Sequence, residues 1–196
     1  MPLREPFDRF VELLAVATEV GPERLPEPTA FALATVGADG QPSVRILLLK
    51  LVDVRGFAFY TNYESRKGEE LISHPQAAMC FHWQPLERQV RVEGTAAPLG
   101  QEAVDAYFAV RPRGSQLGAW ASHQSHVVSG RDELEAAYDD AERRFAGGDV
   151  PTPVEWGGYL VHPESVEFWQ GRPGRMHDRL VYRRTTDGWR TERLAP

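Results

Sequence analysis

Cysteine and lysine are both scarce in this sequence of 196 residues. The single cysteine, Cys80, excludes an internal disulfide framework and any cysteine-rich zinc or iron–sulfur site. Its apolar neighbours predict a small buried side chain rather than a nucleophile. Lysine occurs only at Lys50 and Lys67, so arginine supplies nearly all of the 22 basic residues. Arginine is the better planar partner for phosphate and carboxylate. Part of this excess reflects compositional bias, which makes the two lysines the more informative positions.

Long apolar runs are absent as well. No run approaches the length that spans a bilayer, and residues 1–6 lack the basic and then apolar layout of a signal peptide. We therefore expect a cytoplasmic protein with no membrane partner. The net charge of −6 argues against a nucleic-acid partner and favours small anionic ligands held at a few basic spots. Glycine-rich dinucleotide, P-loop and nucleophile-elbow motifs are also missing.

The hydrophobic patterning predicts one domain over residues 1–196, mainly β with flanking helices. We expect an N-terminal helix over 6–20, a barrel core over 29–99, a helical segment over 100–150 and returning strands over 155–196. The individual strands are predicted at 31–36, 43–52, 57–60, 77–83, 89–97, 156–162, 165–170, 176–184 and 189–194. Helices are predicted at 102–110 and 132–145, with an irregular loop between them. Short strands with tight turns favour a small antiparallel barrel, because parallel strands need long crossovers.

Two basic residues, Arg45 and Lys50, end one predicted apolar strand. Strand alternation sends them to opposite faces. One flat ligand meets both only if the strand bends or two subunits share the site. The alternative is that both are ordinary charges at strand ends.

A polar segment, Tyr60-Thr61-Asn62, leads to a predicted helix that begins with Arg66 and Lys67 after an N-capping Ser65. Backbone N–H groups, hydroxyls and two cations at a helix N-terminus would form a phosphate cradle. The alternative is a solvated helix start. Because basic residues are unfavourable at that end of a helix, their presence favours a binding role.

A second anion site is suggested by Tyr107 and Arg111, which share a predicted helix face, and by the nearby Ser115. An arginine favoured by the helix dipole is the equally plain alternative.

The C-terminal part carries Arg175, His177 and Arg179 at alternate positions, which places all three on one face of an extended strand. We interpret them as facing an anionic ligand, with an exposed edge strand as the alternative. No set of residues suggests a metal site.

These residues lie in a series of motifs that resembles the pyridoxamine 5′-phosphate oxidase family. The motifs are Arg45-Ile-Leu-Leu-Leu-Lys50, Phe59-Tyr-Thr-Asn62, Ser65-Arg-Lys67, Leu86-Glu-Arg-Gln-Val90, Arg111-Pro-Arg113, Ser115-Gln-Leu-Gly-Ala-Trp120, Gln124-Ser125, Val166-Glu-Phe-Trp-Gln170 and Arg175-Met-His-Asp-Arg179. They occur in order from about Pro28 to Pro196. The resemblance implies an FMN-binding split β-barrel and a homodimer with its active sites at the subunit interface. Residues 155–196 would then include the dimerisation region.

The resemblance also implies a role for individual residues. FMN would contact Arg45, Ile46, Leu47, Leu48, Leu49, Lys50, Tyr60, Thr61, Arg66, Lys67, Gln89, Gln124, Ser125, Trp169 and Arg179. The substrate phosphate would be held by Lys50, Tyr107, Arg111 and Ser115. Arg175 and His177 would be the catalytic residues and would lie over the pyridine ring of the substrate.

The implied reaction is the oxidation of pyridoxine or pyridoxamine 5′-phosphate by O₂ to pyridoxal 5′-phosphate. Hydrogen peroxide is released, and ammonia leaves when the amine is the substrate. One alternative is a related FMN oxidase with another substrate, as in phenazine-type pathways. A second is a carrier that binds FMN or pyridoxal phosphate without catalysis. The family commonly has a longer N-terminal arm that closes over the substrate, and we expect closure to differ here.

Overall fold

The computed structural model describes residues 4–196, so residues 1–3 of the stretch tested for a signal peptide lie outside the described residues. The helices are α1 (Glu5–Glu19), α2 (Arg66–Ser73), α3 (Gln101–Ala109), α4 (Arg113–Ala121) and α5 (Arg131–Arg144), with short 3₁₀ turns η1 (Gln84–Leu86) and η2 (Pro173–Arg175). The strands are β1 (Ala30–Val36), β2 (Pro42–Leu48), β3 (Leu51–Asp53), β4 (Gly56–Asn62), β5 (Gln76–Trp83), β6 (Arg88–Pro98), β7 (Trp156–Gln170), β8 (Asp178–Thr185) and β9 (Gly188–Arg193). Within residues 4–196, no helix is long and apolar enough to cross a membrane.

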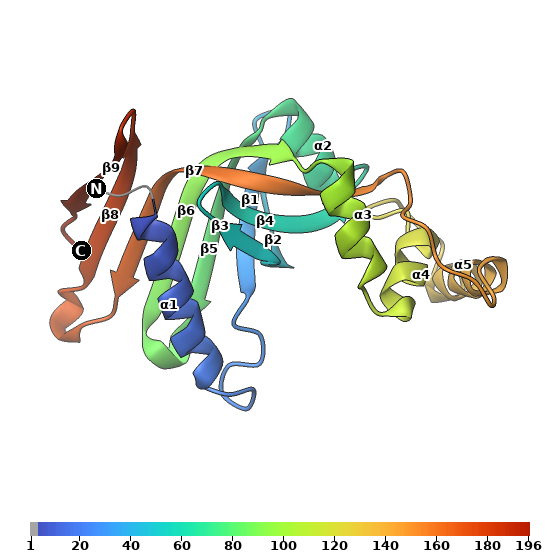
Figure 1. The fold of residues 1–196 in the computed structure, drawn as a ribbon, viewed down its shortest axis with the longest axis horizontal. Helices are drawn as coiled ribbons and strands as arrows, with labels where there is room; N and C mark the ends of the chain where they lie inside the picture. Colours follow the sequence, from blue (N-terminus) through green and yellow to red (C-terminus); the bar gives the residue numbers. More distant parts are fainter. Residues whose placement is uncertain (1–3) are drawn as a thin grey trace.

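The strands form one antiparallel sheet whose order is β2-β1-β5-β6-β7-β4-β3, with β8 and β9 added beside β7 (Figure 1). Strands β2 and β3 end this path, yet only Leu49 and Lys50 separate them in the sequence. The Leu49 amide donates to the Thr29 carbonyl beside β1, whereas the Lys50 amide donates to the Ala58 carbonyl on β4. Because two residues join the two ends of the path, the sheet must curl until those ends lie close together. The result is the predicted mainly β split barrel with flanking helices.

An aromatic core fills the barrel, and α1 covers it. The side chains of Phe7, Phe10 and Ala17 lie on one face of α1 and are buried, as the helical spacing predicts. Phe10 contacts Phe57 and Phe81 at ring-centroid distances of 4.9 and 4.8 Å. A second, smaller hydrophobic cluster joins α3, α4 and α5 to Trp156 at the start of β7. The helices therefore form a group of their own beside the sheet (Figure 1).

Several element predictions are wrong in informative ways. The strand expected over 43–52 is two strands, because the backbone changes its hydrogen-bond partner at Leu49 and Lys50. The loop expected between 110 and 132 contains α4, which Leu117 anchors in the second cluster. The two strands expected over 156–170 form the single strand β7, with a change of register where Gly94 passes Pro163. A Cβ at Gly94 would lie 2.8 Å from the Pro163 Cα, so only glycine fits this close approach.

The cysteine prediction also needs correction. Cys80 lies on β5 between the buried Met79 and Phe81, so strand alternation turns its side chain away from the core. The thiol is half-buried, and burial raises its pKa. The raised pKa agrees with an unreactive thiol.

The aromatic core predicts the effect of truncating Phe10, which is 0% exposed. Phe10→Ala removes ring contacts and leaves a cavity, so the free energy of unfolding should fall by about 3–5 kcal/mol. Urea unfolding at fixed protein concentration measures this change. The control is Val11→Ala at the adjacent position, which is 48% exposed and should change stability by no more than about 0.5 kcal/mol. Equal effects of the two substitutions would contradict this account of the core.

Candidate functional site

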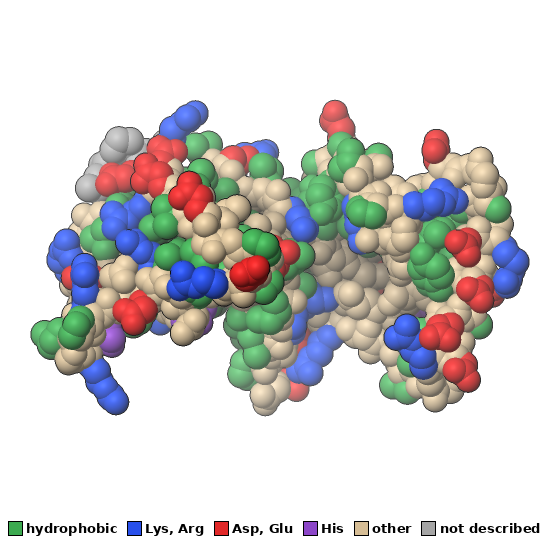
Figure 2. Space-filling view, turned by 90° about the horizontal axis from the view of Figure 1, so that it is seen from below, with side chains coloured by type: hydrophobic (Ala, Val, Ile, Leu, Met, Phe, Trp, Pro, Cys, Tyr) green, Lys and Arg blue, Asp and Glu red, His purple; other side chains and the backbone are tan. Residues whose placement is uncertain are grey.

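A pocket of about 400 Å³ lies between the sheet and the start of the helical group. Figure 2 shows the molecule hollowed between these two parts, with Lys and Arg side chains at the edge of the hollow. The pocket brings together eight of the predicted site residues: Leu47, Lys50, Tyr60, Thr61, Tyr107, Arg111, Ser115 and Gln124. They come from β2, the β2–β3 crossing, β4, α3, the turn between α3 and α4, α4 and the loop after α4.

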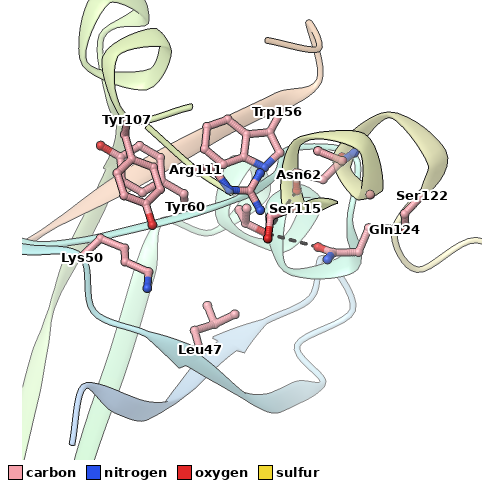
Figure 3. Close-up of a pocket in the computed structure, with 13 residues that line it drawn as sticks. Leu47, Lys50, Tyr60, Asn62, Tyr107, Arg111, Ser115, Ser122, Gln124 and Trp156 are labelled. Carbon is pink, nitrogen blue, oxygen red and sulfur yellow. Dashed lines mark hydrogen bonds between the residues drawn. The ribbon is translucent and has the colours of Figure 1, made fainter. Parts of the chain in front are cut away.

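Stacked aromatic rings form one wall of the pocket (Figure 3). The Tyr60 and Tyr107 rings are parallel, with centroids 4.0 Å apart, and Tyr60 also stacks on Trp156 at 5.4 Å. Burial and the neighbouring Tyr107 raise the pKa of the Tyr60 phenol, so it stays protonated at neutral pH. The sequence interpretation missed Trp156, because a tryptophan at the start of an apolar strand carries no signal that separates a pocket wall from a core.

The pocket has two cations and no Asp or Glu among its described lining residues. The Arg111 guanidinium lies over the Trp156 ring, 4.8 Å from its centroid. Burial lowers the pKa of Arg111, and within residues 4–196 its buried Nη1 has no hydrogen-bond partner. Lys50 points its ammonium into the same space from the opposite side (Figure 3). A half-buried guanidinium whose Nη1 has no partner among the described residues, and which faces a second cation, is suited to an anion with several oxygens.

Arg111 reaches this position differently from the prediction. Helix α3 ends at Ala109, and the Arg111 amide donates to the Phe108 carbonyl in a final turn. Tyr107 and Arg111 therefore do not share a regular helix face, although both line the pocket.

The start of α2 lies beside the pocket, and Ser65 caps it as predicted, with its hydroxyl accepting from the Gly68 amide. The buried Lys67 ammonium donates to Thr61 Oγ1 at 3.0 Å, Ser65 Oγ at 2.9 Å and Gln124 Oε1 at 2.6 Å. These partners are neutral oxygens. Burial, together with the nearby Arg45 charge, lowers the pKa of Lys67 to about 8, and a nearby carboxylate partly offsets this effect.

The loop after α4 closes over this helix start. Ser125 adopts a left-handed backbone conformation with φ of 74°, which is unusual for a residue other than glycine. Its hydroxyl accepts a hydrogen bond from the Arg66 amide at 3.2 Å. Gln124 and Ser125 therefore place two side-chain oxygens where donors of β4 and α2 converge.

A buried carboxylate, Glu70, binds Arg45 and Arg66, two further residues predicted to contact the cofactor. It accepts from the guanidinium groups of Arg45 and Arg66 and from the hydroxyls of Thr35 and Ser43. Burial raises the pKa of Glu70, but these four hydrogen bonds outweigh burial and hold it at about 2. In the sequence alone, Glu70 is only an acidic residue early in a predicted helix.

A second group of predicted residues lies toward the other end of the molecule's long axis (Figure 1). Gln89, Trp169 and Arg179 are in register on the adjacent strands β6, β7 and β8. His177 packs against Trp169 with ring centroids 4.7 Å apart, and its Nδ1 accepts from the Arg172 amide at 3.1 Å. A single chain therefore does not bring this group to the pocket.

The predicted extended strand for Arg175, His177 and Arg179 is wrong. Strand β8 begins at Asp178, whereas Arg175 ends the 3₁₀ turn η2 with a φ of 61°. Arg175 is exposed, and Arg179 pairs with the buried Glu167 at 2.9 Å. The three side chains are thus not a row on one strand face.

Three predicted cofactor contacts, all on the apolar segment after Arg45, do not line the pocket through their side chains. Ile46 is 66% exposed, Leu48 is half-buried and Leu49 packs in the barrel core. Their predicted contact with the cofactor therefore stays a prediction.

Comparison with known proteins gives a consistent result over nearly the whole chain. Residues 18–144 match the family model described as pyridoxamine 5′-phosphate oxidase, and residues 156–196 match pyridoxine 5′-phosphate oxidase C-terminal dimerisation region. A pyridoxine/pyridoxamine 5′-phosphate oxidase of a Nocardioides species is 65% identical over 170 residues, which cover 87% of this chain and 79% of that protein.

Two solved structures share the fold. PhzG from Burkholderia lata, in complex with tetrahydrophenazine-1-carboxylic acid, is 33% identical with a TM-score of 0.91, covering 97% of this chain and 92% of that one. A pyridoxamine 5′-phosphate oxidase-related, FMN-binding protein from Nostoc punctiforme is 19% identical with a TM-score of 0.74, covering 94% and 96%. The second likeness shows the fold alone.

The buried lysine predicts how stability depends on pH. The folded-state pKa of Lys67, about 8, lies below the reference value of 10.5, so between these values the unfolded chain holds a proton that the folded chain has lost. The free energy of unfolding should therefore rise with pH from 8 to 10, by at most about 1.4 kcal/mol per unit. Urea unfolding of cofactor-free protein and of Lys67→Met, at each pH, isolates this contribution. The difference between them should grow with pH, and a constant difference would contradict the assignment.

Proposed function

This chain belongs to the pyridoxamine 5′-phosphate oxidase family, and on that premise we propose that it oxidises pyridoxine 5′-phosphate or pyridoxamine 5′-phosphate to pyridoxal 5′-phosphate, with FMN as cofactor. In this proposal O₂ is the final electron acceptor, hydrogen peroxide is released, and the amine substrate also releases ammonia. The observation that carries the proposal is the pocket with two cations, one of which, Arg111, has an Nη1 with no hydrogen-bond partner among the described residues.

The substrate phosphate is assigned to Lys50, Tyr107, Arg111 and Ser115. Two cations and two hydroxyls match a group with three anionic oxygens better than they match a neutral ligand. The phosphate is remote from the carbon that is oxidised, so its binding energy serves to orient the substrate rather than to carry out the chemistry. The stacked rings of Tyr60 and Tyr107 provide a flat apolar wall beside this anchor.

The start of α2 fits the phosphate of FMN. Lys67 is buried with a lowered pKa among neutral oxygens, so an added anion would raise that pKa and stabilise the charged form. Lys67 is the second residue of α2 and Arg66 the first, so both belong to the helix end that favours an anion. When bound, FMN supplies the two-electron oxidation, while the protein binds and orients both molecules.

The second group of residues is assigned to the same site through a second copy of the chain. We propose a homodimer in which Gln89, Trp169 and Arg179 of the partner complete the FMN site. The match of residues 156–196 to a dimerisation region supports this arrangement. Arg175 and His177 come from the same segment and would face the substrate ring across the interface.

The local geometry gives His177 a defined role in this site. Because its Nδ1 accepts from the Arg172 amide, the neutral ring carries its proton at Nε2. His177 therefore offers a donor from Nε2, while the guanidinium of Arg175 can stabilise negative charge that develops on the substrate.

A related flavoenzyme acting on a phenazine precursor is the second candidate, since PhzG shares the fold at 33% identity. Its ligand carries a carboxylate, which an arginine also binds. The pocket's two cations and two hydroxyls favour a phosphate over a single carboxylate. A carrier that binds FMN or pyridoxal phosphate without turnover is the third candidate, and a cytoplasmic location stays a prediction from the sequence.

Turnover of defined substrates tests these proposals. FMN-loaded protein in air is given pyridoxine phosphate, pyridoxamine phosphate or a reduced phenazine carboxylic acid, and aldehyde and hydrogen peroxide are measured. Equimolar aldehyde and peroxide from a B6 phosphate are expected. Peroxide from the phenazine compound alone would favour the second candidate, and FMN binding without any peroxide would favour the carrier.

The phosphate assignment predicts a substrate-dependent effect of Arg111→Gln. Loss of the guanidinium should lower kcat/KM for pyridoxine 5′-phosphate by about 10- to 100-fold, as expected for a hydrogen bond between charged groups. The control is the same variant with pyridoxine, which has no phosphate and should show little change. Equal losses with both substrates would show that Arg111 does not bind the phosphate.

A further inference from the structure

We infer that Glu70 is a positioning residue of the cofactor site, whose buried carboxylate aims Arg66 at the FMN phosphate and keeps Lys67 charged beside it. This inference rests on the FMN site proposed above. Glu70 is not among the cofactor or substrate contacts that the sequence predicted.

The Glu70 carboxylate connects three elements of the fold. Its Oε2 accepts from Ser43 Oγ at 2.6 Å and from Arg45 Nη2 at 3.1 Å, on β2, and from Thr35 Oγ1 on β1. Its Oε1 accepts from Arg66 Nε at 2.8 Å, one turn earlier on α2. Both oxygens are therefore used, and the Glu70 side chain is only 6% exposed.

Arg66 is held by one edge only. Its Nε binds Glu70, whereas within residues 4–196 its two Nη groups bind nothing and its side chain is 60% exposed. A guanidinium fixed at Nε presents its Nη donors in a set direction, because the group is planar. Arg66 is the first residue of α2, the helix end where an anion is favoured, and its Nε contact with Glu70 leaves both Nη groups available to a ligand. Glu70 thus lowers the entropic cost of using Arg66 as a phosphate ligand.

Arg45 differs from Arg66 in that the protein itself binds both of its Nη groups. Its Nη1 donates to the Leu33 carbonyl at 3.2 Å and to Thr35, and its Nη2 donates to Ser43 and Glu70. The side chain is only 19% exposed. In this structure, Arg45 acts mainly as a fixed positive charge next to the site, and Glu70 is the charge that balances it.

That balance matters for Lys67. Arg45 lowers the pKa of Lys67 and Glu70 raises it, while the other groups that Lys67 contacts, on β4, at the α2 cap and in the loop after α4, are neutral. Replacing Glu70 by glutamine removes the negative charge and leaves Arg45 unopposed. The pKa of Lys67 then falls further, and a neutral Lys67 no longer attracts a phosphate.

The test compares Glu70→Gln with Glu69→Gln in full-length, FMN-free protein. Glu69 is the adjacent residue on α2 and is exposed, so its substitution makes the same change in net charge without touching the carboxylate cluster. Quenching of flavin fluorescence on titration gives the Kd for FMN at each pH from 7 to 9.5. The FMN phosphate is a dianion across this range in every sample. Thermal unfolding and circular dichroism report the fold.

We expect Glu70→Gln to raise the Kd for FMN about tenfold at pH 7.5, equivalent to about 1.4 kcal/mol. The Kd of Glu69→Gln should equal that of the wild type. The wild-type affinity should decline above pH 8, where the free lysine loses its proton, and in Glu70→Gln the decline should begin at lower pH. A purely structural role would weaken binding without moving this onset. An unchanged Kd and an unchanged onset in Glu70→Gln would overturn the inference.

A double-mutant comparison asks whether Glu70 acts through Arg66. In the Arg66→Gln background, Glu70→Gln should weaken FMN binding by a smaller factor than in the wild type, because the oriented guanidinium is already gone. Equal factors in the two backgrounds would overturn the positioning of Arg66.

A second substitution keeps the inference testable if Glu70→Gln does not fold. Glu70→Asp retains the charge but withdraws the carboxylate by one methylene, so it should weaken FMN binding while leaving the pH onset near that of the wild type. Wild-type affinity in Glu70→Asp would overturn the inference. A wild-type chain that does not bind FMN would instead refute the proposed function.

Discussion

The two-residue crossing at Leu49 and Lys50 is the constraint on which the rest of the structure depends. It joins the two ends of the strand order, so the sheet can satisfy both backbone partners only by curling. Leu49 turns inward and is 5% exposed in the core, and the next residue, Lys50, is turned out to the pocket. Arg45 and Lys50 do not lie on one regular strand, so strand alternation does not decide which way their side chains point. Arg45 binds Glu70 on α2, and Lys50 faces the pocket.

Strand β7 sets the distance between the two groups of predicted site residues. It begins at Trp156, in the pocket wall, and carries Trp169 near its other end. Thirteen residues of extended strand span about 40 Å, and β7 is paired along its length with β6, β4 and β8. No loop movement within one chain can close such a gap while this ladder persists. A site that uses both groups therefore needs two chains, with one end of β7 from one chain close to the other end of β7 from its partner.

The sequence predicted the parts of this fold that depend on local pattern. The N-terminal helix, the Ser65 cap and the strand expected at 89–97 all reappear in the structure. Helix α4 was missed because Pro112, Gly114 and Gly118 are typical of loops, and its stability comes from burying Leu117 against other helices. The site was predicted mainly through the family resemblance, and the roles of its residues stay predictions.

Glu70 shows most clearly what a sequence alone does not reveal. The role of Glu70 depends on its contacts with β1 and β2. Its partners there, Thr35 and Arg45, precede it by 35 and 25 positions along the chain. Pattern analysis sees only an acidic residue early in a helix, which helix electrostatics already explain. Glu167 is similar, since its pairing with Arg179 arises only when β7 and β8 lie side by side.

The scarcity of lysine acquires a chemical meaning once both lysines are placed. Lys50 faces the pocket and Lys67 is buried beside it, while the other basic side chains of the chain are arginines. Neutral primary amines condense readily with aldehydes, whereas a guanidinium stays protonated and does not. If the product is the aldehyde proposed above, the surface of residues 4–196 away from the pocket offers it no lysine with which to react. An aldehyde that has left the pocket therefore meets arginine side chains there and no further lysine.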